Sequence, residues 1–61
     1  MLKDCKYDKV KLLYAMSKMA WFIEKHAKHN AQKEGDSACH QACLNLQKDL
    51  EQHIETFKRI L

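Results

Sequence analysis

Apolar residues recur along the first half of the chain at intervals of three and four, the spacing of one face of an α-helix. The sequence therefore predicts a first helix from about residue 4 to residue 34. Its seam, the face that packs against a neighbouring helix, consists of Leu2, Leu13, Met16, Ala20, Ile23, Ala27 and Ala31. A second column repeats every seven residues and widens this seam; it consists of Cys5, Leu12, Met19 and His26.

The helical pattern breaks at residues 33–37, where Gly35 suits the left-handed position that follows a helix. Asp36 or Ser37 is suited to cap a second helix, from about residue 37 to residue 60. The seam of this helix is expected at Cys39, Cys43, Leu46, Leu50, His53 or Ile54, Phe57 and Leu61. Because so short a turn makes the helices antiparallel, the predicted fold is an all-α two-helix hairpin in one domain, residues 1–61.

Aromatic residues lie outside the seam of the first helix. Tyr7, Tyr14 and Trp21 form a third column with a seven-residue repeat, and Phe22 lies nearly opposite the seam. The middle of the helix is therefore apolar on almost every side, which is typical of a helix that is buried all round. The residues expected to contact a second molecule are Tyr14, Met19, Trp21, Phe22 and Ile23.

The chain has 61 residues, and domains of this size usually need disulfides, a metal or oligomerisation to be stable. A lone hairpin has one contact seam, so we expect a homodimeric four-helix bundle with coiled-coil-like packing. Alternatively, Met16, Met19, Trp21 and Phe22 form a docking groove for the helix of a different protein. The charged N-terminus predicts no signal peptide, and the apolar stretch 12–23 is too short to span a bilayer. A cytoplasmic protein is expected.

The positive charge is concentrated in the first helix. The formal net charge is +3, and residues 1–34 contain eight lysines against four acidic residues. Lys11, Lys18, Lys25 and Lys28 fall on the same side as the aromatic column, and lysines with stacking rings are a pattern of RNA- or DNA-binding surfaces. The alternative is a solvated face whose lysine stems pack around an aromatic oligomer contact.

In length, hairpin layout and charge distribution the chain resembles the Rop family of plasmid copy-number regulators. The resemblance implies a dimeric four-helix bundle that binds RNA through the face of its first helix. It includes no residue motif, so it assigns no functional residue, and a shared fold does not establish a shared function.

Cysteine and histidine residues gather near the turn. Cys39 and Cys43 are one helical turn apart, and His26 is expected near them across the hairpin. Such a set is a candidate site for Zn²⁺ or Cu⁺, although its spacing matches no standard zinc motif. The alternatives are packed, inert thiols and redox chemistry.

No arrangement of residues in the sequence resembles a catalytic site. Glu24, Glu51 and Glu55 are expected on the solvated surface, and no nucleophile–base pair is evident. The sequence therefore predicts a small interaction or regulatory protein without enzymatic activity or cofactor.

Overall fold

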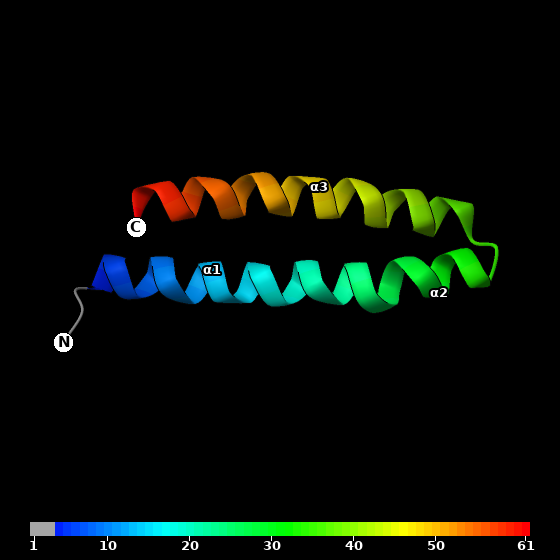
Figure 1. Cartoon of the computed structure of the whole chain (residues 1–61), viewed down its shortest axis with the longest axis horizontal. Coiled ribbons are helices and arrows are strands. Elements are labelled where there is room, and N and C mark those ends of the chain that lie inside the picture. Colours follow the sequence, from blue (N-terminus) through cyan, green and yellow to red (C-terminus); the bar gives the residue numbers. More distant parts are fainter. Residues whose placement is uncertain (1–3) are drawn as a thin grey trace.

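The computed structural model describes residues 4–61, which form a helical hairpin (Figure 1). The first rod consists of α1 (Asp4–Phe22), the short segment η1 (Ile23–Ala27) and α2 (Lys28–Lys33). The second rod is α3 (Ser37–Ile60), which runs back alongside the first. Within residues 4–61 there is no strand, so the predicted all-α hairpin is confirmed, together with its boundaries to within one residue. The start of α1 and the end of α3 lie at the same end of the hairpin.

The turn between the rods ends one helix and starts the next with local hydrogen bonds. Gly35 has a φ of 73°. Its N–H donates to the Gln32 carbonyl at 3.1 Å, and the N–H of Asp36 donates to the Ala31 carbonyl at 2.9 Å. This pair of bonds is the Schellman motif, which satisfies the last carbonyls of a helix. Asp36 then caps α3, because its Oδ1 accepts a hydrogen bond from the Cys39 N–H at 3.0 Å.

The first rod is not a uniform α-helix. In η1 the N–H of Lys28 donates to the carbonyl of Ile23, five residues earlier, which makes this segment a π-helical turn. The predicted extent of the first helix is correct, and the π-helical turn within it is a feature that the sequence pattern does not indicate. A π-turn brings residues five apart close together, and the rings of Trp21 and His26 are accordingly 5.3 Å apart in an edge-on arrangement.

Only two apolar residues in the described part of the chain are buried, Ile23 at 3% exposure and Ala31 at 6%. Other seam positions of the first rod are half-buried, as predicted: Leu13, Met16, Ala20 and Ala27. Leu2 lies outside the described residues. In α3 the half-buried positions are His40, Cys43, Leu44, Gln47, Leu50, Ile54 and Phe57.

The seam predicted for α3 is partly wrong. Cys39, Leu46 and Leu61 are exposed, whereas Leu44, which was not predicted, is half-buried. Of the two alternatives His53 and Ile54, the structure selects Ile54. On the first rod the second column, which includes Cys5, Leu12, Met19 and His26, is exposed as well. The apolar stripe on each helix is wider than one neighbouring helix covers, so the hairpin contact uses only one side of each stripe.

The isolated hairpin therefore leaves much apolar surface uncovered. Its accessible surface is 4995 Å², whereas a compact monomer of this mass exposes roughly 4,100 Å². In the described residues, no helix is long and apolar enough to cross a membrane.

Candidate oligomer interface

Two exposed columns of mainly apolar residues run along the hairpin. On α1 the column consists of Cys5, Leu12 and Met19, and on α3 it consists of Cys39, Leu46, His53 and Ile60. Both columns repeat every seven residues, the spacing of a helix face that contacts another helix along its length. Leu12 and Met19 are each 49% exposed, Leu46 47% and Ile60 51%.

The two columns lie on the same broad side of the hairpin. With 100° between successive residues, each column is rotated about a quarter turn around the helix axis from the seam of its own helix, in the same sense on both helices. Antiparallel helices that face each other bring matching flanks of this kind to one side. We call this side the open face and define it by the seven residues of the two columns.

The opposite side of the hairpin carries a polar contact between the two rods. Glu24 accepts a hydrogen bond through Oε2 from Lys28 Nζ at 2.5 Å and another from Gln47 Nε2 at 3.1 Å. These bonds, with the charge of Lys28, hold the pKa of the Glu24 carboxyl below its ordinary value of 4.5. Glu24 is therefore part of the hairpin contact, a role that the sequence does not predict, although its side chain stays 45% exposed.

This contact makes the stability difference between wild type and Glu24→Gln depend on pH. Because the pKa of Glu24 is lowered by folding, its stabilising effect is present above about pH 4.5 and is lost as the pH falls through the folded-state pKa. We expect Glu24→Gln to be less stable than wild type at pH 7, with a difference that shrinks as the pH falls below 4.5, as measured by urea unfolding. A difference that stays constant from pH 7 down to the lowest pH at which the chain is folded would contradict the assignment.

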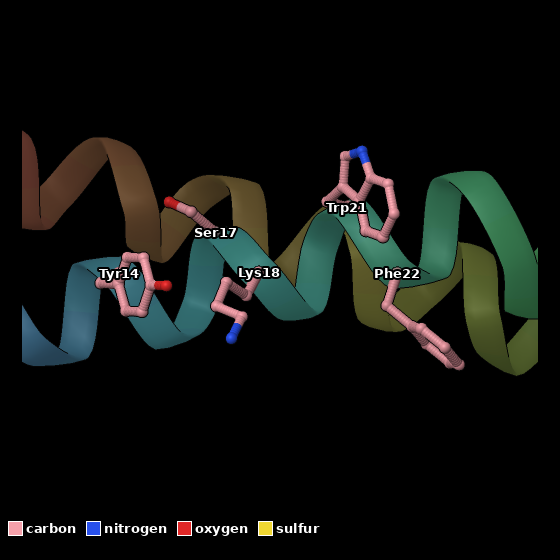
Figure 2. A pocket seen from close by; sticks show the side chains of 5 residues that line it. All are labelled: Tyr14, Ser17, Lys18, Trp21 and Phe22. Carbon is pink, nitrogen blue, oxygen red and sulfur yellow. The ribbon is translucent and has the colours of Figure 1, made fainter.

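The predicted contact residues do not form one surface. Figure 2 shows Trp21 and Phe22 pointing to opposite sides of α1, with Tyr14 and Lys18 on the preceding turns of the helix. A shallow groove of about 350 Å³ is lined by Tyr14, Ser17, Lys18, Trp21 and Phe22. Tyr14 is 64% exposed, Trp21 57% and Phe22 54%.

Two of the five predicted contact residues, Met19 and Ile23, do not line this aromatic groove. Met19 belongs to the open face. Ile23 is buried inside the hairpin, so it is unavailable to a second molecule, and its assignment as a contact residue is corrected. The sequence pattern misplaced it because Ile23 directly follows two exposed rings in a stretch that is apolar on every side.

The predicted basic face is reduced by one lysine. Lys11, Lys18 and Lys25 are exposed, but Lys28 is half-buried and paired with Glu24. The ammonium groups of Lys11 and Lys18 lie 5.8 Å and 5.2 Å from the ring centroids of Tyr7 and Tyr14, within the range of cation–π contacts. Nucleic-acid binding by this face stays a prediction.

The cysteine and histidine residues near the turn do not converge. His26 packs its ring against Trp21 and Phe22, with the Phe22 ring centroid at 5.4 Å. Across residues 4–61, no three or more His, Cys, Asp or Glu side chains are grouped so that they could hold a metal ion. Hydrogen bonding with the Cys43 thiol, and repulsion from its charged form, raise the pKa of Cys39. A raised pKa lowers the thiolate fraction on which metal binding and redox chemistry depend.

Comparison with known proteins yields no matching family model, no similar curated protein and no similar solved structure. The resemblance to Rop-type regulators therefore remains one of length, layout and charge. The assignment of the open face as a candidate interface is therefore based only on the exposure and spacing of its residues in this chain. One signal for it is already visible in the sequence, the seven-residue repeat Cys39, Leu46, His53 and Ile60.

Proposed function

We propose that the protein is a non-enzymatic helical interaction module that acts as a homodimer, with the open faces of two hairpins packed into a four-helix bundle. The observation that carries this proposal is the pair of exposed seven-residue columns on one side of the hairpin. Leu12 and Met19 come from α1 and Leu46 and Ile60 from α3, and each is about half exposed. Burial of such side chains is the main favourable term in helix association.

The size of the open face fits a second copy of the chain. The hairpin measures 47 × 17 × 12 Å between its extreme Cα atoms, so its broad side covers on the order of 800 Å². A standard-size interface buries about 800 Å² on each partner. The surface of the hairpin beyond that of a compact monomer is of the same order. One copy of the same face is therefore enough to cover it.

Packing through the open face leaves the outer side of α1 free. Tyr14 and Trp21 would stay exposed there and could recruit a further molecule. In this arrangement the dimer is the structural unit, and the rings of Tyr14 and Trp21 remain on its surface.

The test is the mass of the full chain in solution. The chain has a mass of 7.2 kDa, and we expect light scattering to give twice this value at micromolar concentration under reducing conditions. Because dimerisation and folding are coupled, the helical circular dichroism signal should fall on dilution. A fully helical 7.2 kDa species at 200 µM would reject the proposal.

A further inference from the structure

We propose that the two hairpins pack with their turns at the same end, so that α1 of each subunit lies on α3 of the partner. This inference rests on the proposed homodimer and specifies its arrangement. A symmetric face-to-face dimer has its two-fold axis in the plane of the interface. An axis along the helices places α1 on α3 of the partner, whereas an axis across them places α1 on α1 and α3 on α3, with the turns at opposite ends.

The charges of the two helices favour the first arrangement. Residues 1–34 contain eight lysines against four acidic residues, whereas residues 35–61 contain three basic residues against four acidic ones. Packing α1 on α1 would bring two strongly basic helices together. Packing α1 on α3 places each basic helix beside one with three basic and three acidic residues, which avoids the repulsion between two basic helices.

A hollow on α1 matches an apolar side chain of α3. Asp8, Lys11, Leu12 and Ala15 line a hollow of about 360 Å³, with the i, i+3, i+4, i+7 spacing of a hole that receives a knob from a facing helix. Lys9 Nζ donates to the Ile60 carbonyl at 3.2 Å, so Ile60 lies level with this hollow. A two-fold axis along the helices leaves the height of every residue along the bundle unchanged in the partner subunit. Ile60 of the partner subunit, 51% exposed in the hairpin, therefore meets the hollow.

The same geometry predicts an ion pair between subunits. The pairs Glu24–Gln47 and Lys9–Ile60 fix which residues of the two rods lie at the same height along the hairpin. In this register Asp49 lies within one helical turn of the height of Lys18. At 100° per residue, Lys18 and Asp49 occupy opposite outer edges of one hairpin, too far apart to pair within it. When α1 lies on α3 of the partner, the outer edges adjoin and Lys18 approaches Asp49 of the partner subunit.

A charge-swap cycle on the otherwise unchanged chain tests this pair. We expect Lys18→Glu and Asp49→Lys each to raise the dimer dissociation constant roughly two- to tenfold, because the pair occurs twice in a symmetric dimer. The double variant should recover most of the wild-type affinity. Strictly additive effects of the two substitutions would overturn the proposed arrangement.

Spin labels at the turn measure the arrangement directly. We would place one label at Glu34→Cys, an exposed turn position, after replacing Cys5, Cys39 and Cys43 by alanine. Turns at the same end should give a label separation under about 30 Å, given helix spacings of 8–10 Å. Turns at opposite ends of a bundle 47 Å long would give more than about 40 Å, and that result would overturn the inference.

The two proposals fail in different ways. A labelled dimer with distant labels rejects only the same-end arrangement and leaves the homodimer intact. A monomeric wild-type chain rejects the homodimer itself. If the cysteine replacements prevent folding, the charge-swap cycle, which keeps all native cysteines, decides the arrangement.

Discussion

Met19→Glu should convert the dimer into a chain that is monomeric and largely unfolded at micromolar concentration. Met19 lies near the middle of the α1 column of the open face and is 49% exposed in the hairpin. In the proposed dimer it is covered, and a carboxylate placed there without a partner would be desolvated. Desolvation of this carboxylate costs about 2–3 kcal/mol in each subunit. Because the symmetric dimer contains two such sites, the dissociation constant should rise roughly 10³- to 10⁴-fold.

The matched control is Tyr14→Glu on the same helix. Tyr14 is 64% exposed on the aromatic groove, which the proposed dimer leaves open, so this variant should remain dimeric with a dissociation constant within about tenfold of wild type. Light scattering and the dilution dependence of helicity measure both variants. The reverse outcome, with Tyr14→Glu monomeric and Met19→Glu dimeric, would move the interface to the aromatic groove.

Ile23→Ala should produce the largest loss of stability among single truncations in the hairpin. Ile23 is 3% exposed, and it is the only large side chain that is buried among residues 4–61. Removing its three outer carbons leaves a cavity that two rigid rods fill poorly, so we expect a loss of about 2–4 kcal/mol. Urea unfolding at a matched chain concentration measures this loss.

Val10→Ala is the control for Ile23→Ala. Val10 lies on the same rod but is 42% exposed and outside the open face. Its truncation should change the free energy of unfolding by less than about 1 kcal/mol, partly because alanine favours the helix. Equal, small losses for the two variants would show that the contact between the rods contributes little to stability.

The periodicity of the chain was sufficient to predict the hairpin. Intervals of three and four define both helices, and Gly35 with Asp36 marks the turn, because the left-handed position and the capping oxygen are local requirements of the backbone. These local signals do not depend on what packs against the helix. For that reason the predicted helix boundaries agree with the structure to within one residue.

Contacts between the rods were harder to predict. The sequence placed Cys39 and Leu46 at the seam, and the structure places Leu44 and Gln47 there instead. A wide apolar stripe on a helix predicts that the helix has neighbours, but it does not specify which part of the stripe faces which neighbour. The half-buried position of Glu24 and the π-helical turn at η1 likewise depend on contacts that no periodicity contains.

The sequence by itself determined that the chain forms two amphipathic helices joined by a tight turn, with more apolar surface than one hairpin covers. Only the tertiary structure decided which residues stay uncovered. It buries Ile23, pairs Lys28 with Glu24, and leaves the two seven-residue columns exposed. The physical reason is that helix formation depends on local backbone and side-chain preferences, whereas the orientation of each face is set by the packing of one rod against the other.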